Sequence, residues 1–222
     1  MDSWLQRLAV RGPADDIAAF KKATASPSKA DYLYERAQFR TQRLSFVKLR
    51  SALPPSLADG IDEAQDPWDL VIDPPRRFRD GTIEITYRFQ LDAFEPENLI
   101  AAASTMFPRL MYVLGTVAPS ADEQSSLLAH AGKVRRWRIS NRIKEPICAK
   151  IPEETEDNGD EVLWALAEAD SKMMDEVMNH WKKKVDEIIV QSGNARPLKH
   201  RRSPKTRRGR ISNDDRVSRE GR

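Results

Sequence analysis

Apolar and polar positions alternate near the start of the chain and then change to a helical spacing. Leu8 and Val10 alternate with polar neighbours, which is typical of a half-buried strand. Pro13 suits the first turn of a helix, where its missing N–H costs nothing, and Ile17 and Phe20 would share the buried face of that helix. This segment therefore predicts a strand followed by a helix.

The same plan returns with a stronger signal in the middle of the chain. Residues 82–91 alternate apolar and polar side chains, and this is the clearest strand pattern in the sequence. Pro96 opens a helix that should end near Phe107, because Pro108 disfavours helical geometry in the residue before it. Residues 109–117 are mostly apolar and predict a central strand. A strand, a helix and a returning strand, occurring twice, indicate a split β-α-β arrangement.

The connecting segments carry weaker signals. Residues 43–50 are predicted to form the return strand of the first unit, and residues 28–41 have the pattern of a short helix. Residues 53–80 contain Leu-Pro-Pro, Asp-Pro-Trp and Asp-Pro-Pro, so they are predicted to be largely loop. Residues 121–132 predict a short helix that ends at a glycine. Residues 133–140 predict an edge strand whose arginines discourage pairing with another chain.

The longest helical pattern covers residues 161–190, after an acidic linker at 146–160. Its apolar seam repeats at alternating steps of three and four residues, with Ser171 in the one gap. The seam consists of Trp164, Ala167, Met174, Met178, Trp181, Val185 and Ile188. Such a seam either packs against the sheet of the same chain or binds a partner helix. The contacts to a partner would be Met174, Met178, Trp181, Val185 and Ile188.

Charge is distributed unevenly along the 222 residues. The chain has 37 Lys and Arg against 34 Asp and Glu, a net charge of +3. Residues 192–222 hold 11 basic and 3 acidic residues, which leaves 26 basic and 31 acidic residues in the rest. This last segment has almost no apolar side chains, so it cannot bury enough surface to offset chain entropy. We predict that it is a disordered basic tail.

The basic tail is the strongest functional signal in the sequence. Residues 196–210 include eight Lys and Arg, one His and no acid. Such residues release counterions when they bind phosphates, which gives a salt-dependent and sequence-tolerant attraction to DNA or RNA. The candidate contacts are Arg201, Arg202, Arg207 and Arg208 in the tail, and Arg135, Arg136 and Arg138 in the edge strand. The alternatives are a tail that only solubilises the chain, and an edge strand whose Trp137 faces the core.

No motif for catalysis or for a cofactor is visible. The three histidines lie far apart, the nine glycines are scattered, and no phosphate loop or nucleophile elbow occurs. The single cysteine, Cys148, fits a reducing compartment. No stretch approaches the roughly 20 apolar residues that span a bilayer. We therefore expect a cytoplasmic protein that is not an enzyme and has no metal, no cofactor and no membrane contact.

Several short stretches resemble the YubB-type ferredoxin-like domain, also called Api92-like. That family begins with a Trp, a short strand, a Gly-containing turn and a helix with an inward Phe; a strand leading into a Pro-Pro loop and a Phe-Pro turn follow. The matching positions are Trp4, Val10, Gly12 and Phe20, then residues 46–60, then Phe107 with Pro108. The family occurs in phages, plasmids and integrated elements. The resemblance, over residues 1–140, implies a ferredoxin-like fold and a mobile-element origin, and it implies no catalytic residues.

Together these patterns predict an α+β protein. Residues 1–145 would form a ferredoxin-like two-layer sandwich with an antiparallel or mixed sheet. The linker at 146–160, an amphipathic helix at 161–191 and the tail at 192–222 would follow. The leading functional hypothesis is a non-catalytic accessory or binding protein of a mobile element, with a protein partner. The second hypothesis is a nucleic-acid-binding protein that uses the basic tail.

Overall fold

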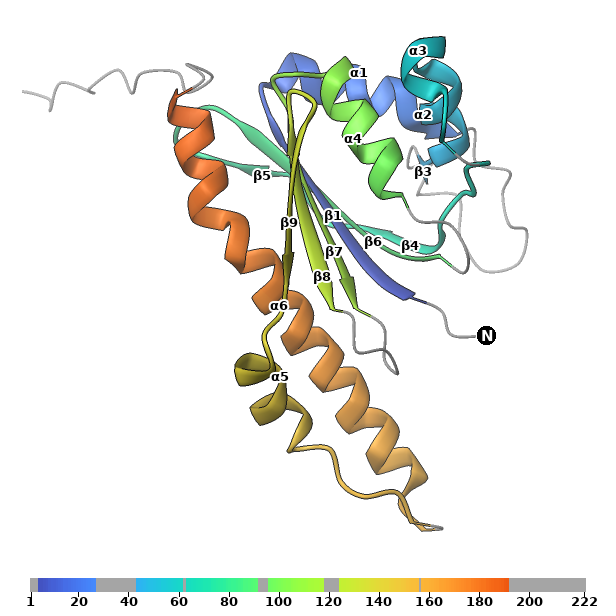
Figure 1. Cartoon of the computed structure of the whole chain (residues 1–222), viewed down its shortest axis with the longest axis vertical. Helices are drawn as coiled ribbons and strands as arrows, with labels where there is room; N and C mark the ends of the chain where they lie inside the picture. Colours follow the sequence, from blue (N-terminus) through green and yellow to red (C-terminus); the bar gives the residue numbers. More distant parts are fainter. Residues whose placement is uncertain are drawn as a thin grey trace, which may run out of the picture.

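The computed structural model describes residues 4–26, 43–61, 63–91, 96–117, 124–155 and 157–191 (Figure 1). Within these ranges the chain is an α+β structure, in which one antiparallel sheet lies between two sets of helices. Two predictions fall outside the described residues. They are the helix at 28–41 and the disordered tail with Arg201, Arg202, Arg207 and Arg208.

The main sheet is antiparallel, and its strand order is β4-β6-β1-β7-β8-β9, with β5 also pairing with β6. Its strands are β1 (Trp4–Gly12), β4 (Trp68–Ile72), β5 (Arg76–Arg77), β6 (Ile83–Leu91), β7 (Met111–Val117), β8 (Ser125–His130) and β9 (Lys133–Arg138). A separate pair is formed by β2 (Ala25–Ser26) and β3 (Arg43–Leu44). The predictions of β1, β6, the central strand β7 and the edge strand β9 are confirmed.

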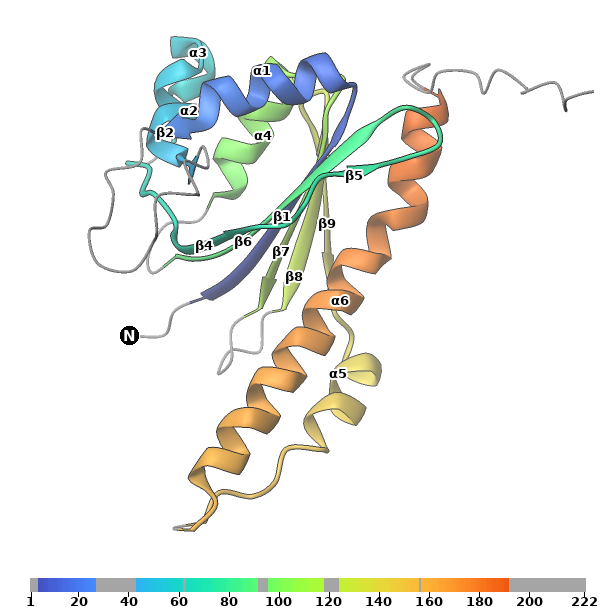
Figure 2. The same cartoon turned by 180° about the vertical axis from the view of Figure 1, so that it is seen from behind.

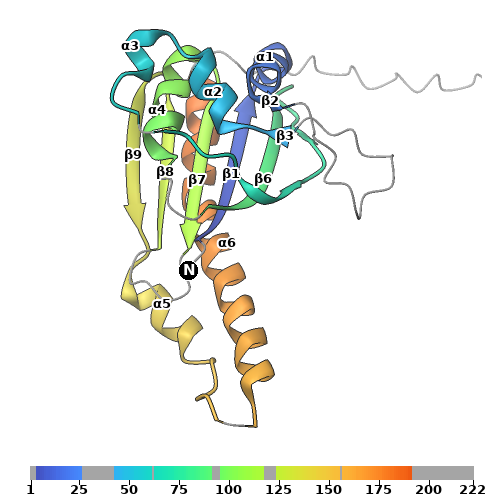
Figure 3. The same ribbon diagram turned by 90° about the vertical axis from the view of Figure 1, so that its right-hand side faces the viewer.

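Four helices lie on one side of the sheet (Figure 3). They are α1 (Ala14–Thr24), α2 (Phe46–Ala52), α3 (Pro55–Ala58) and α4 (Glu97–Met106). Leu8 and Val10 of β1 and Phe20 of α1 are completely buried in the core beneath these helices. Helices α1 and α4 begin directly after Pro13 and Pro96, as the sequence predicts.

Helix α6 (Gly159–Gln191) crosses the opposite face and packs on β7 and β8 (Figure 2). Its N-terminal part extends beyond the sheet beside α5 (Asn141–Cys148), and the two form a projecting arm (Figure 1). All seven residues of β7 are buried, because helices cover both of its faces. The predicted long helix is confirmed. The described residues form three layers, whereas the sequence predicted two.

The return strand predicted at residues 43–50 is wrong, because helix α2 occupies most of that segment. Ser45 begins the helix, since its hydroxyl accepts a hydrogen bond from the backbone N–H of Lys48. Phe46 and Leu49 are both buried, and their separation by three residues places them on one side of a helical turn.

The short helix predicted at residues 121–132 is also wrong, because its second half forms β8. Strands β8 and β9 form a hairpin, and its turn residues Ala131 and Gly132 have φ angles of 49° and 75°. Turns with two positive φ angles match the twist of paired strands. Residues 127–129 form an apolar run without alternation, because β8 is buried on both faces.

The loop predicted at residues 53–80 is partly wrong, since α3, β4 and β5 lie within it. Strands β4 and β5 are short, and the register against β6 shifts between Trp68 and Val71. Such irregular edge strands leave little alternation in the sequence. The acidic linker predicted at 146–160 likewise begins inside α5, which contains Pro146.

The apolar seam predicted on α6 is confirmed only in its C-terminal part. Trp181 and Val185 are buried against the sheet. Trp164 is 78% exposed, and the buried face at that end is formed by Val162 and Ala169 instead. The reason is that the arm has no sheet beneath it and packs its apolar side against α5.

Candidate binding pocket between helix α6 and the sheet

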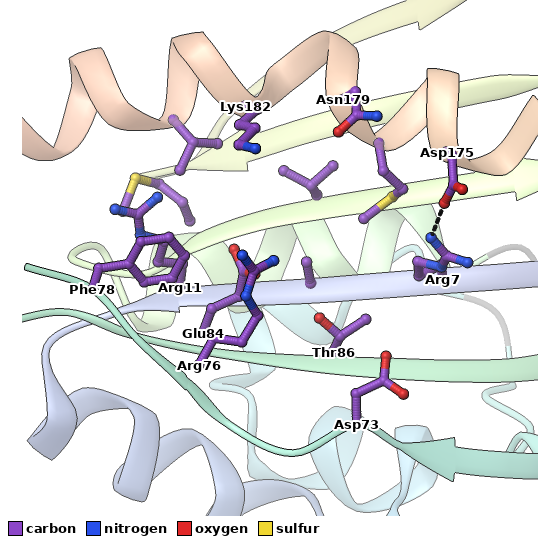
Figure 4. A pocket seen from close by; sticks show the side chains of 15 residues that line it. Arg7, Arg11, Asp73, Arg76, Phe78, Glu84, Thr86, Asp175, Asn179 and Lys182 are labelled. Atoms are coloured by element: carbon purple, nitrogen blue, oxygen red, sulfur yellow. Dashed lines mark hydrogen bonds and ion pairs between the residues drawn. The ribbon is translucent and has the colours of Figure 1, made fainter.

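Strand β1 presents different side chains to its two faces. Leu8 and Val10 point into the core beneath α1 and α4, so Arg7, Ala9 and Arg11 point to the α6 side (Figure 4). Two arginines therefore flank a small side chain on the central strand. The space above Ala9 is bounded by charged groups at both ends.

Arg11 is the most fully bonded of these side chains. Its guanidinium donates hydrogen bonds to Asp186 of α6 (2.6 Å), to Asp80 (2.9 Å) and to the Thr82 hydroxyl (3.0 Å). The guanidinium carbon lies 3.5 Å from the centroid of the Phe78 ring, and the residue is 5% exposed. Arg11 thus joins three parts of the chain: β1, the β5–β6 connection and α6.

Arg7 makes a second connection between β1 and α6. Its guanidinium donates a 2.7 Å hydrogen bond to Asp175. Asp175 and Asp186 are three helical turns apart, about 16 Å, while Arg7 and Arg11 are about 13 Å apart along the strand. The two spacings are close enough for both ion pairs to form at once. Helix α6 is therefore tied to β1 at two points.

A cavity of about 290 Å³ lies between these two ion pairs. Ala9 and Thr86, which face each other on β1 and β6, line it from the sheet, and Met178, Asn179 and Lys182 line it from α6 (Figure 4). Small side chains on the strands leave this volume unfilled. The cavity combines an apolar wall with charged side chains, as ligand pockets do.

Glu84 is one of three carboxylates that line this cavity, and the other two, Asp175 and Asp73, accept hydrogen bonds from Arg7 and Arg88. Glu84 lies opposite Arg11 in the register of β1 and β6, and its nearest basic atom on β5 is a terminal nitrogen of Arg76 at 3.8 Å. The side chain is only 19% exposed, and no described residue donates a hydrogen bond to it. Burial raises the pKa of Glu84 above its ordinary value, and the positive charges of Arg11 and Arg76 offset only part of that rise.

Basic side chains gather at the end of the sheet where α6 ends. Strand β5 and the β5–β6 connection carry Arg76, Arg77 and Arg79, and the β8–β9 hairpin carries Lys133 and Arg135. Gly12 at the end of β1 pairs with Ile83 at the start of β6, so the β5–β6 connection lies at this end of the sheet. Met111 pairs with both Arg11 and His130, so the β8–β9 hairpin lies at the same end. The front and back views show β5 near the C-terminal part of α6, where Arg11 bonds to both Asp80 and Asp186 (Figures 1 and 2).

The three arginines predicted on the edge strand are not brought together. Arg135 lines a shallow hollow beside Ile188 and Gln191 at the end of α6. Arg136 lies on the other face of the sheet, where it donates a 2.7 Å hydrogen bond to Glu97 of α4. Arg138 is exposed. Alternate residues of one strand point to opposite faces, so only part of this set can meet one ligand.

The residues predicted to bind a partner helix pack on the chain's own sheet. Met174 and Met178 lie over Gly115 of β7, where an added Cβ would come within 2.8 Å and 3.0 Å of their sulfurs. The indole N–H of Trp181 donates a 2.8 Å hydrogen bond to Ser126 of β8. Val185 and Ile188 belong to the same contact with the sheet. The sequence left two alternatives for this seam, packing on the chain's own sheet or binding a partner helix, and the structure shows packing on the sheet.

No local pattern in the sequence indicates the pocket. Arg7, Arg11 and Glu84 look like the outward residues of ordinary alternating strands, because nothing local shows that α6 covers them. One available signal is the run at residues 76–79, where three arginines surround Phe78 beside two prolines. That run combines basic and aromatic residues in a connection between strands.

Comparison with protein-family models, with curated proteins and with solved structures finds no match to this chain. The resemblance to the YubB-type domain therefore stays a prediction. In the part of the chain that the structure describes, no helix is both long and apolar enough to cross a membrane. Among those same residues, no three His, Cys, Asp or Glu side chains lie close enough together to hold a metal ion.

Proposed function

We propose that this protein binds nucleic acid, without catalysing a reaction on it, at the end of the sheet where α6 ends. The observation that carries the proposal is the position of two basic connections, β5–β6 and β8–β9, on either side of that helix end. Lys182 of α6 lines the pocket on the β5 side of that helix end, and the basic segment 192–222 follows α6 directly in the sequence. Basic groups that converge in this way bind phosphates with release of counterions.

The strand order supports a ferredoxin-like core within this proposal. Strands β4, β6, β1 and β7 are neighbours in that order, with α1 and α4 as the crossovers on one face. A β-α-β-β-α-β chain that folds in this way has the split connections of a ferredoxin-like domain. Strands β8 and β9 and helix α6 would then be additions. An accessory role in a mobile element rests on the sequence resemblance alone.

The test is a titration of a fluorescein-labelled single-stranded 20-mer with the full chain, followed by anisotropy at 50 and 200 mM salt. We expect binding at 50 mM that weakens at least about tenfold at 200 mM, because several phosphates are neutralised. Removal of residues 192–222 should cost most of the affinity. Absence of binding at 50 mM salt would contradict the proposal.

A matched pair of variants tests the role of the folded surface. Arg77→Gln with Arg79→Gln removes two exposed charges from β5 and the β5–β6 connection, and Arg142→Gln with Lys150→Gln removes two exposed charges from the arm. The first pair should weaken binding several-fold and reduce the salt slope by about 1–2. The second should change the affinity less than about twofold, since the arm lies at the other end of the molecule (Figure 1). Equal effects would mean that net charge alone attracts the strand.

A protein partner is the second candidate function, and the arm is the surface that favours it. Leu163 and Trp164 are 65% and 78% exposed, which is unusual for two adjacent large apolar residues. Purified full-length chain should retain a partner in a pull-down that Trp164→Ser abolishes. The same variant should leave nucleic-acid binding unchanged, because Trp164 is remote from the basic end.

A further inference from the structure

The pocket between α6 and the sheet contains two polar groups whose hydrogen-bonding capacity is unused. Glu84 accepts no hydrogen bond from the described residues, and the buried Nε of Arg7 has no acceptor among them. Both residues line the same cavity (Figure 4). Glu84 has only the 3.8 Å ion pair with Arg76. Buried polar groups are normally hydrogen-bonded, so a carboxylate without a hydrogen-bond donor and an N–H without an acceptor in one cavity point to a bound ligand.

The cavity restricts the ligand by its size and by its walls. A volume of about 290 Å³ is at the lower end for small-molecule sites, and it suits one ring system with little else. Ala9, Val113 and Met178 give that ring an apolar contact surface. Lys182 and the exposed Arg76 stand at the margin, where they would meet a negative group attached to the ring.

We propose that this pocket binds one guanine base, with Glu84 accepting hydrogen bonds from its N1–H and its 2-amino group. A carboxylate has two acceptor oxygens side by side, and guanine presents two adjacent donors on its Watson–Crick edge. Thymine and uracil present one N–H between two carbonyls, which a carboxylate would repel. The phosphate, which is joined to the base through the sugar, would lie near Lys182 and Arg76.

The guanine can come from an unpaired position of a strand or from a free nucleotide. The first case rests on the proposed function, because the basic end of the sheet would hold the backbone next to the pocket. Bases of single strands are commonly read in this way, splayed out and bonded on the Watson–Crick edge. Binding of a free nucleotide requires only the pocket and does not depend on the proposed function.

The first experiment compares two labelled 8-mers, one of thymidines only and one with a single central guanosine, at 50 mM salt. The full chain should bind the guanosine strand about tenfold more tightly, the discrimination expected of one bidentate contact. An inosine in place of guanosine lacks the 2-amino group and should give an intermediate ratio. Glu84→Gln should reduce the ratio of the two dissociation constants to about one.

A second variant keeps every charge in place. Ala9→Leu fills the floor of the cavity, and it should also bring the ratio to about one. The double variant Arg142→Gln with Lys150→Gln should keep the tenfold ratio. Thermal melting of each variant, followed by circular dichroism, establishes that it is folded before the ratio is interpreted.

The outcomes separate this inference from the proposed function. Salt-sensitive binding of both strands with equal affinity would overturn the guanine site and leave the proposed function intact. If neither strand binds, the proposed function fails, and a calorimetric titration with guanosine monophosphate decides the inference. Saturable binding that Glu84→Gln removes supports the site for the free nucleotide, and no binding overturns it.

Discussion

The two faces of the sheet are built differently. Beneath α1, α2 and α4 the core is apolar and aromatic, with Phe20 and Tyr112 meeting edge to face at 5.6 Å and Phe46 and Phe89 at 5.5 Å. Beneath α6, apolar contacts form a strip along β7 and β8. Over β1 and β6 that strip gives way to ion pairs and a cavity.

Strand β6 shows what the difference means. Ile85, Tyr87 and Phe89 fill the first core, while Glu84, Thr86 and Arg88 alternate with them on the α6 side. A polar face of this kind is ordinary on an exposed sheet. Here α6 covers part of it, so the side chains of Arg11 and Glu84 are largely buried, and buried charged groups are common at functional sites.

The largest difference should appear on removal of packing from each face. Phe20→Ala should lower the free energy of unfolding by about 3–5 kcal/mol, because Phe20 is completely buried between Phe107 and Tyr112. Met178→Ala should cost less than about 2 kcal/mol, since Met178 is partly exposed and already borders a cavity. Urea unfolding of both variants measures this. Equal losses would show that the α6 face is packed as tightly as the other.

The two ion pairs between β1 and α6 give the next comparison. Arg11→Met should cost about 2–3 kcal/mol, because it removes a buried guanidinium and leaves Asp80 and Asp186 without their partner. Arg7→Met should cost less than about 1 kcal/mol, because Asp175 is largely exposed. Urea unfolding followed by tryptophan fluorescence, which includes the buried Trp181, reports both. A similar cost at the two sites would contradict a special role for Arg11.

The sequence predicts the fold best where one face of a helix or strand is buried and the other is exposed to solvent. Strand β6 alternates for this reason, and its limits were found almost to the residue. Strand β8 has no alternation because both faces are covered, and its apolar run therefore predicts a helix. The sequence of helix α2 predicts a strand, because the helix is short and only Phe46 and Leu49 mark its buried side.

The pocket could not be predicted, because the residues that form it are far apart in the sequence. Arg7 meets Asp175 across 168 positions, and Arg11 meets Asp186 across 175. The predicted seam identified the right side of α6 near Trp181 and Val185. It did not show which strands that side of α6 would cover. Glu84 is largely buried because α6 lies over its part of the sheet.

Tyr112 tests whether the first face tolerates polar groups. Its hydroxyl is buried, and no described residue forms a hydrogen bond with it. Burial, with a contribution from the charge of Asp16, raises the pKa of Tyr112. Tyr112→Phe should therefore increase the free energy of unfolding by about 1 kcal/mol, because an unpaired buried hydroxyl is removed.

The matched change on the α6 side is Trp181→Phe. It removes a paired donor and leaves the hydroxyl of Ser126 without its 2.8 Å partner, so it should lower the free energy of unfolding by about 1–2 kcal/mol. If urea unfolding shows that Tyr112→Phe raises the free energy of unfolding and Trp181→Phe lowers it, the contrast between an unpaired and a paired polar group is supported. A loss of stability for Tyr112→Phe would mean that the hydroxyl has a partner.

Glu84 gives the smallest effect and the sharpest test of the α6 face. The pKa of Glu84 in the folded chain is raised above its ordinary value of 4.5. At a pH just above that value, Glu84 therefore holds its proton more in the folded chain than in the unfolded chain. The ionised carboxylate therefore lowers stability at neutral pH, and this cost disappears as the pH falls and the group is protonated. The charges that face it are Arg11, Arg76, Lys182 and Asp186.

Glu84→Gln keeps the shape of the side chain and removes the titration. At pH 7.5 the variant should melt about 1–2 °C above the parent chain, and the difference should shrink towards pH 4.5. Melting curves over this range measure it, with Asp73→Asn as the control, because Asp73 accepts two hydrogen bonds from Arg88 and its loss should lower stability. A parent chain more stable than Glu84→Gln at pH 7.5 would mean that the carboxylate holds the fold together. A less stable parent would mean that the chain retains a carboxylate that weakens its fold, as a residue that serves a ligand does.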